Sequence, residues 1–143
     1  MKTNGYNIEK FNTFYHNFFK TKTFYFLKIT LIIYQLYMHE LESANEIDFD
    51  DMIIKATEVV QKYGVKNNYK YIIIDEYQDS SLVRFNLIKS IIDKTSASLF
   101  VVGDDFQSIY KFAGCDLNVM LKFRSYFPDG KLLKISNTYR NSQ

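Results

Sequence analysis

Two short apolar runs stand out in a chain whose other apolar positions mostly recur at helical spacing. Residues 71–74 read Tyr-Ile-Ile-Ile, and residues 99–102 read Leu-Phe-Val-Val. A continuous apolar run of this length is typical of a strand in a parallel sheet that is covered on both faces. A third short run occupies residues 132–135. The pattern therefore predicts parallel strands near residues 71–75, 99–102 and 132–135.

Helical patterns are predicted before, between and after these strands. Residues 82–92 carry apolar side chains three or four positions apart, as expected of a helix that crosses over between parallel strands. Asp48 precedes a similar pattern that ends near Gly64, which indicates an N-capped helix and a glycine stop. Asp116 precedes another helical pattern, and Pro-Asp-Gly at 128–130 reads as a turn. The second half of the chain is thus predicted to be an α/β unit.

The beginning of the chain is rich in aromatic and apolar residues. Residues 11–19 repeat aromatic side chains at helical spacing, and a second apolar stretch covers residues 24–38. That stretch is about 15 residues long and contains Lys28 and Gln35, whereas a membrane-spanning helix needs about 20 apolar residues. No signal-peptide pattern opens the chain. We therefore expect an all-helical segment over residues 1–64 and no membrane span.

Composition narrows the class of protein without identifying a function. The chain has 143 residues, of which 47% are hydrophobic and 24% charged, which suits one domain with a moderate core. The net charge is only +2, so a role in nucleic-acid binding has to be inferred from motifs. Cys115 is the only cysteine, which rules out an internal disulfide and favours a cytoplasmic location. His16 and His39 lack partners at ligand spacing, so no zinc site is expected.

Carboxylates follow the first predicted strand directly. Asp75 and Glu76 stand where the apolar run ends, and ligands of open α/β sheets bind beyond the carboxyl ends of the strands. One carboxylate there can hold Mg²⁺ while its neighbour orients or deprotonates the water that attacks a γ-phosphate. The alternative is that these acids cap the next helix.

A second polar segment follows the second predicted strand. Gly103 allows a sharp backbone turn, and Asp104 and Asp105 come next. Gln107 offers a neutral amide that can bond a phosphate oxygen or the attacking water. Because the crossover makes the two strands neighbours, both acidic edges are expected to face one cleft.

These segments together resemble the superfamily 1 DNA helicases of the UvrD/Rep type, and within that group most closely helicase IV. The resemblance covers residues 69–143. Residues 75–79, Asp-Glu-Tyr-Gln-Asp, are similar to the Walker B motif of the family, and residues 103–114 resemble Gly-Asp-Asp-x-Gln-Ser-Ile-Tyr-x-Phe-x-Gly. Residues 137–140 match its Tyr-Arg motif, and residues 47–52 are a weaker match to an Asp-Phe-x-Asp segment upstream.

The resemblance implies a partial RecA-like P-loop NTPase domain. Residues 1–64 would belong to an accessory helical subdomain of the first motor domain, and residues 65–143 would form the C-terminal part of the ATP-binding domain. The implied activity is ATP hydrolysis coupled to translocation on single-stranded DNA and to duplex unwinding, in the 3′ to 5′ direction. ATP and Mg²⁺ are the implied cofactors. Single-stranded DNA, duplex junctions and the rest of a helicase polypeptide are the implied partners.

The resemblance also implies roles for individual catalytic residues. Asp75 would bind Mg²⁺, and Glu76 would be the catalytic base. Gln107 would sense the γ-phosphate, and Arg140 would contact the phosphates, since a guanidinium bonds two phosphate oxygens at once. A solvated surface charge is the alternative for Arg140.

Two aromatic residues are similar to the positions that contact DNA in this family. Tyr110 and Phe112 would stack on unpaired bases, which requires no particular base identity. Packing of a short helix onto the sheet is the alternative for both. Phe112 and Ala113 stand where many relatives carry tryptophan and arginine, a departure shared with helicase IV-like members.

The sequence lacks the Gly-x-x-x-x-Gly-Lys-Ser/Thr loop that cradles phosphates. Gly130 is the one glycine in the sequence that precedes a lysine. The residue after that lysine is Leu132, where the loop requires a serine or threonine. We therefore expect an internal or truncated piece of a helicase, about half of one ATP-binding domain and inactive in isolation.

Two other functions stay open. A metal-dependent nuclease would use clustered carboxylates to hold two ions and would cut DNA without nucleotide; the candidates are Asp75, Glu76, Asp79, Asp104 and Asp105. A non-catalytic remnant or single-strand-binding module is the other, because an incomplete phosphate cradle loses the preorganised stabilisation of phosphoryl transfer.

Overall fold

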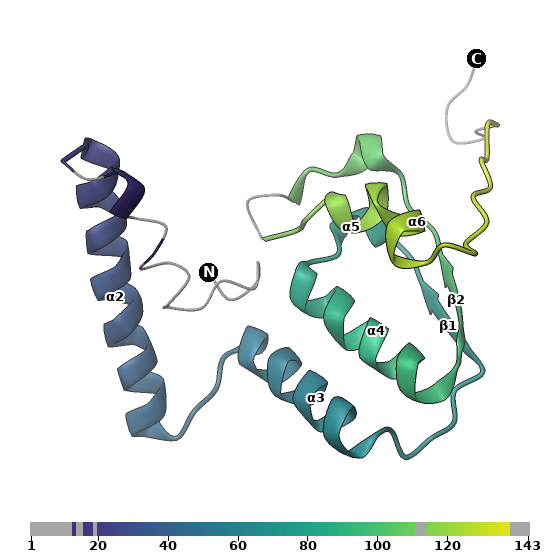
Figure 1. The fold of residues 1–143 in the computed structure, drawn as a ribbon, viewed down its shortest axis with the longest axis horizontal. Coiled ribbons are helices and arrows are strands. Elements are labelled where there is room, and N and C mark those ends of the chain that lie inside the picture. The colour runs from purple at the N-terminus through teal and green to yellow at the C-terminus, as the bar shows by residue number, and fades with distance from the viewer. Residues whose placement is uncertain (1–12, 14–15, 19, 111–113, 138–143) are drawn as a thin grey trace.

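The computed structural model describes residues 13, 16–18, 20–110 and 114–137 (Figure 1). The helix expected over residues 11–19 lies largely outside this part. In the labels below, η marks a 3₁₀ helix. The elements in chain order are η2 (His16–Phe18), α2 (Lys22–Ala44), α3 (Phe49–Tyr63), β1 (Tyr71–Ile74), η3 (Tyr77–Asp79), α4 (Leu82–Thr95), β2 (Ser98–Val101), η4 (Asp105–Gln107), α5 (Asn118–Leu121) and α6 (Phe123–Tyr126).

The helix α2 confirms the prediction for residues 24–38 and is longer at both ends. Its first turn is capped by Thr21, whose Oγ1 accepts a hydrogen bond from the Phe24 N–H at 3.1 Å. It ends at Asn45, which takes the left-handed conformation. Figure 1 shows α2 standing apart from the body that contains the sheet. No helix within the described residues is long and apolar enough to span a membrane.

The helix α3 begins at the acidic cap that the sequence predicts. Asp48 Oδ1 accepts from the Asp51 N–H at 2.8 Å, and the Asp51 carboxylate accepts from the Asp48 N–H, so two backbone donors of the first turn are satisfied. The helix ends before Gly64, whose φ of 77° confirms the predicted glycine stop. It packs against α4, and Gln61 Nε2 donates to Ser90 Oγ at 3.1 Å.

Two of the three predicted strands form, and α4 crosses over between them. β1 and β2 pair in parallel, with Tyr71 opposite Ser98 and Ile74 opposite Val101. The third strand, expected at residues 132–135, is wrong: this segment has no regular structure, and Leu133 is 83% exposed. A strand persists where a neighbouring strand supplies its hydrogen bonds, and the sheet of the described residues contains β1 and β2 alone.

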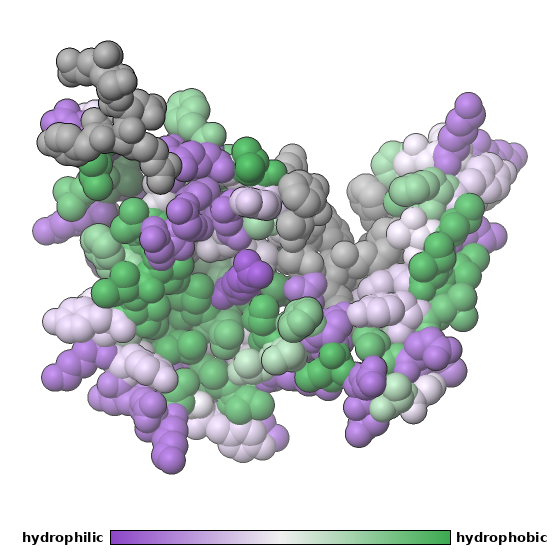
Figure 2. Space-filling model, turned by 180° about the vertical axis from the view of Figure 1, so that it is seen from behind, coloured by the Kyte–Doolittle hydropathy of each residue, from purple (hydrophilic) through white to green (hydrophobic). Residues whose placement is uncertain are grey.

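The core lies between the sheet and the helices on one of its faces. Tyr77, Phe85 and Val119 are buried together, and Ile74 and Val101 pack against them from the strands. The apolar runs predicted strands covered on both faces, and this is wrong for the opposite face. Side chains alternate along each strand, and Ile73, next to the packed Ile74, is 74% exposed. Seen from behind, hydrophobic residues gather on the body that holds the sheet and along α2 (Figure 2).

The helix predicted after Asp116 forms as two short pieces. Asp116 Oδ1 accepts from the Asn118 N–H at 3.0 Å, but Leu117 holds the capping position, and the helix breaks at Lys122 between α5 and α6. The turn predicted at residues 128–130 is confirmed, with the Gly130 N–H donating to the Phe127 carbonyl at 2.9 Å. These pieces carry Val119 into the core and so fix the chain that follows β2.

Candidate functional site

The carboxyl ends of β1 and β2 bring the two acidic segments together. Just past the strands, the Val102 N–H donates to the Ile74 carbonyl and the Tyr77 N–H donates to the Val102 carbonyl, both at 2.9 Å. These bonds extend the parallel ladder beyond the strand ends. The two acidic segments are therefore neighbours at one edge of the sheet, and the cleft expected between them stays a prediction.

The first acidic segment makes a tight left-handed turn. Glu76 has φ 50° and ψ 43°, a region that residues other than glycine occupy infrequently. The Asp75 carboxylate accepts from the Glu76 N–H at 2.9 Å, which holds the turn. Both side chains are exposed at the edge of the sheet. Such backbone outliers cluster at functional sites, where the surrounding structure stabilises them.

The Asp75 carboxylate could serve as one ligand of a Mg²⁺ ion. Mg²⁺ is usually held by one or two carboxylates, with phosphate oxygens and waters completing its shell, and the exposed Asp75 carboxylate at a strand end fits that pattern. Among the residues that the structure describes, no three or more His, Cys, Asp or Glu side chains form a group that could hold a metal by themselves. The carboxylates considered for a nuclease do not form such a group.

Gln78 connects the two segments, and the sequence reasoning assigned it no role. Its side chain is 1% exposed. Its Nε2 donates to Glu76 Oε2 at 2.7 Å, and its Oε1 accepts from the Asp104 N–H at 3.0 Å. Its position two residues after Glu76 was visible in the motif, but its burial depends on the second segment.

Gly103 is required by a close approach rather than by a sharp turn, which corrects the reason that the sequence suggested. Its φ is not positive. A Cβ added there would lie 2.6 Å from Gln78 Oε1 and 3.1 Å from the Gln78 backbone nitrogen. Any side chain would therefore push Gln78 out of its place.

The second acidic segment is built around Asp104. Its Oδ1 accepts from the Phe106 N–H at 3.1 Å and caps η4, while its Oδ2 accepts from Gln107 Nε2 at 2.7 Å. Gln107 is thereby held, exposed, at the same edge of the sheet as Glu76. Phe106 beside it is 93% exposed. The sequence did not indicate Phe106 as a candidate contact residue.

The residues predicted to contact DNA or the phosphates lie partly within and partly outside the described residues. Tyr110 is exposed shortly after η4. Phe112 and Arg140 lie outside the described residues. The roles assigned to Asp75, Glu76, Gln107, Tyr110, Phe112 and Arg140 stay predictions.

Neither of two other reactive groups near the edge is primed as a nucleophile. Burial raises the pKa of the Cys115 thiol, and the nearby Asp79 carboxylate raises it further while Arg84 opposes the change. Cys115 Sγ instead donates to the Asp79 carbonyl at 2.9 Å. Burial, with a smaller contribution from Tyr126, raises the pKa of Tyr77 to about 12. Both groups stay protonated at neutral pH and serve packing.

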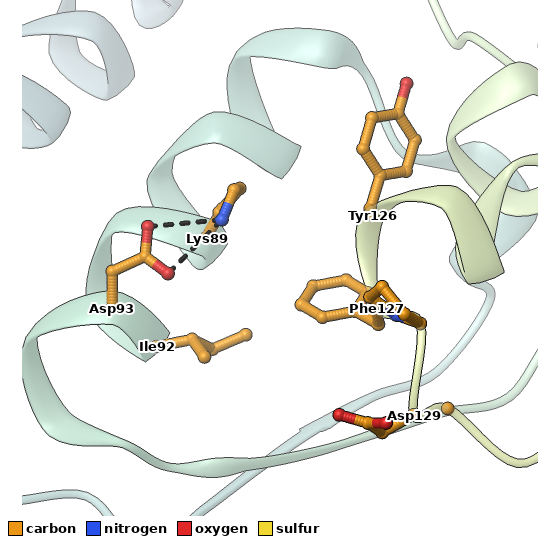
Figure 3. Close-up of a pocket in the computed structure, with 8 residues that line it drawn as sticks. Lys89, Ile92, Asp93, Tyr126, Phe127 and Asp129 are labelled. Atoms are coloured by element: carbon orange, nitrogen blue, oxygen red, sulfur yellow. Dashed lines mark hydrogen bonds and ion pairs between the residues drawn. The ribbon is translucent and has the colours of Figure 1, made fainter.

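A groove of about 250 Å³ lies elsewhere, between α4 and the turn that follows α6 (Figure 3). Lys89 and Asp93, paired at 3.2 Å, border it on α4, and Phe127 and Asp129 border it on the turn. None of the predicted site residues lines it. The edge of the sheet is therefore the better candidate for chemistry.

Residues 2–128 match the family model described as UvrD/REP helicase N-terminal domain. Over 131 residues the chain is 31% identical to the ATP-dependent DNA helicase PcrA of Staphylococcus aureus, covering 87% of this chain and 18% of that protein. Over 119 residues it is 33% identical to a probable DNA helicase II homolog of Mycoplasma capricolum, covering 78% and 16%. The chain thus spans less than a fifth of the length of these relatives.

Proposed function

Because the chain belongs to the UvrD/REP helicase N-terminal domain family, we propose that it is part of an ATP-dependent DNA helicase and forms one wall of its ATP site. The observation that carries this proposal is the meeting of Glu76 and Gln107 at the ends of two parallel strands. Gln78 and Asp104 join them through hydrogen bonds of 2.7 to 3.0 Å.

In this proposal, Glu76 and Gln107 act on the water that attacks the γ-phosphate. Glu76 accepts the proton of that water, and Gln107 bonds the γ-phosphate once it turns away from Asp104. Asp75 holds Mg²⁺, which when bound would neutralise charge that develops on the phosphate oxygens. Arg140 supplies a guanidinium to the same oxygens.

The sequence contains no phosphate-binding loop motif, so in this proposal another polypeptide segment supplies the loop. We propose that residues 65–143 are the C-terminal part of a RecA-like domain, with the helical residues 1–64 as its accessory segment. The isolated chain is then expected to be inactive. A helicase IV-like subgroup and a cytoplasmic location are part of the same proposal.

DNA contact is proposed for the loop that follows η4. Tyr110 and Phe112 would stack on unpaired bases, and translocation would run 3′ to 5′ along the single strand. Duplex junctions and the rest of the motor would be the other partners. Tyr110 is 46% exposed, so part of its surface is accessible to a base.

The proposal is tested by Mg²⁺-dependent ATP hydrolysis of the full chain, with and without single-stranded DNA. The reaction is run alone and with a separately expressed family segment that carries the phosphate-binding loop. We expect turnover only in the mixture, stimulated by DNA and abolished by Glu76→Gln. Turnover that Glu76→Gln leaves unchanged would refute the assignment of the base.

A single-strand-binding module without catalysis is the second candidate, favoured by the exposed Phe106 and Tyr110 on one loop. Fluorescence anisotropy with a labelled oligonucleotide separates the two. DNA binding that weakens in Tyr110→Ala, with no turnover in any mixture, would favour the module. Cleavage of DNA in Mg²⁺ without nucleotide would instead favour the nuclease.

A further inference from the structure

A continuous chain of hydrogen bonds runs from the proposed base to the proposed γ-phosphate sensor. Glu76 Oε2 accepts from Gln78 Nε2 at 2.7 Å, and Gln78 Oε1 accepts from the Asp104 N–H at 3.0 Å. The Asp104 carboxylate then accepts from Gln107 Nε2 at 2.7 Å. Of the four residues joined by these hydrogen bonds, Gln78 is buried and Glu76, Asp104 and Gln107 are exposed.

The surroundings leave Gln78 little freedom to move. A buried amide whose donor and acceptor are both engaged is costly to displace, because either group would be left unsatisfied. Gly103 lies so close that a Cβ there would meet Gln78 Oε1 at 2.6 Å. The Gln78 carbonyl also accepts from Ser108 Oγ at 3.5 Å, beyond η4. Movement of the segment after β2 therefore changes the position of Gln78.

The orientation of the Glu76 carboxylate depends on its hydrogen bond from Gln78 more than that of a surface carboxylate normally depends on one contact. It sits on a left-handed backbone at an exposed edge, where water competes for its oxygens. The bond from Gln78 is short and its acceptor is charged, which makes it stronger than a bond between neutral groups. Loss of that donor would let the carboxylate turn toward solvent.

We propose that Gln78 is a positioning residue that couples the segment carrying Gln107 to the orientation of the Glu76 carboxylate. When Gln107 turns from Asp104 to a γ-phosphate, Asp104 shifts, Gln78 follows, and the base is aligned for the attacking water. The catalytic meaning of this coupling rests on the proposed function, whereas the coupling itself is a property of the folded chain.

The test uses NMR on the isotope-labelled 143-residue chain without nucleotide. Glu76→Ala removes the acceptor of Gln78. Glu58→Ala is the matched control, since it removes an exposed carboxylate on α3, outside both acidic segments. We expect Glu76→Ala to shift the side-chain amide signals of Gln78 and to speed solvent exchange of the Asp104 amide by about 5-fold. Glu58→Ala should leave both unchanged.

A second variant tests the route of the coupling. Gln78→Met keeps the length of the side chain but has neither amide group, so Glu76→Ala should no longer alter Asp104 in that background. If Gln78→Met does not fold, the comparison of Glu76→Ala with Glu58→Ala decides alone. Ser90→Ala, which changes a buried polar residue in α4, is the control for lost stability. It should leave the exchange rate of the Asp104 amide unchanged.

An Asp104 amide whose exchange is unchanged by Glu76→Ala, or that responds equally to Glu58→Ala, would overturn the proposal. So would a response to Glu76→Ala that persists in Gln78→Met. None of these measurements involves ATP, so failure of the hydrolysis experiment would refute the proposed function and leave the coupling standing.

Discussion

Two helices of this chain are rich in apolar side chains, yet they are buried to different extents: Leu31 is the one buried residue of α2, whereas α4 buries three. In α4, Phe85 is 3% exposed and lies in the core between the sheet and α6, whereas Phe26 in α2 is 68% exposed. Both helices are well capped by local residues, Ser81 in α4 and Thr21 in α2. The difference teaches that local signals form a helix, while burial of its side chains requires a neighbouring element.

The largest loss of stability is expected from a substitution in the packed helix α4, and the matched substitution in α2 should have little effect. Phe85→Ala removes a ring that contacts Tyr126 and Phe127, and should lower the free energy of unfolding by about 3–5 kcal/mol. Phe26→Ala is the matched change in α2 and should stay within about 0.5 kcal/mol. Urea unfolding measures both. Equal losses would mean that α2 is packed in solution.

The next effect concerns the close approach at the strand ends. Gly103→Ala would place a Cβ against Gln78 and should cost about 1–3 kcal/mol, with displacement of the Gln78 amide. Ser98→Ala, at the other end of β2 and exposed, is the control. Thermal unfolding and the Gln78 side-chain amide signals provide the readout. A stable Gly103→Ala with unshifted Gln78 signals would contradict the steric account.

A smaller effect is expected where α2 and α3 meet. Asp48 caps α3 and also accepts from Tyr37 Oη of α2 at 2.9 Å. Asp48→Ala should cost about 1 kcal/mol, and Asp48→Asn, which keeps a capping oxygen, should recover most of it. Circular dichroism during urea unfolding reports the change. If Asp48→Asn were as unstable as Asp48→Ala, the cap would not be the cause.

The smallest effect at neutral pH is expected inside the packed region, at a hydroxyl. The Tyr77 Oη is buried without a hydrogen-bond partner within the described residues. Tyr77→Phe should therefore be neutral or stabilising by up to about 1 kcal/mol at pH 7. Tyr71→Phe, on the uncovered face of the sheet, is the matched change at an exposed ring.

The same residue predicts a pH dependence. The folded pKa of Tyr77 is about 12, above the ordinary value of 10.0, so the folded chain holds this proton more tightly than the unfolded chain does. Its contribution is fully present below pH 10 and is lost as the pH rises from 10 to 12. Unfolding of wild type and Tyr77→Phe across that range measures it. If the free energy of unfolding changed with pH in the same way for wild type and Tyr77→Phe, the raised pKa of Tyr77 would be contradicted.

Much of the local structure was predictable, since its causes lie within a few residues. The strands β1 and β2 follow from apolar runs, α4 from helical spacing, and α3 from the Asp48 cap and the Gly64 stop. The meeting of the acidic segments followed as well, because a helical crossover makes parallel strands neighbours. At residues 132–135 the same reasoning gave a strand that does not form, since pairing needs a partner that a sequence window does not contain.

The location of the candidate site residues at one edge of the sheet was predictable, while their roles stay predictions and the hydrogen bonds between them were not predictable. Residue types and spacing pointed to Asp75, Glu76 and Gln107 at one edge. The burial of Gln78 and its two hydrogen bonds were not predictable, because its partners Glu76 and Asp104 stand on segments that meet only after folding.

The sequence by itself determined where α3, α4, β1 and β2 form, through capping groups, apolar spacing and turn residues that act over a few positions. The tertiary structure alone decided that most apolar side chains of α2 stay exposed, that Gly103 must lack a side chain, and that Gln78 joins the two acidic segments. The physical reason is that burial and close contact depend on atoms brought together from distant parts of the chain.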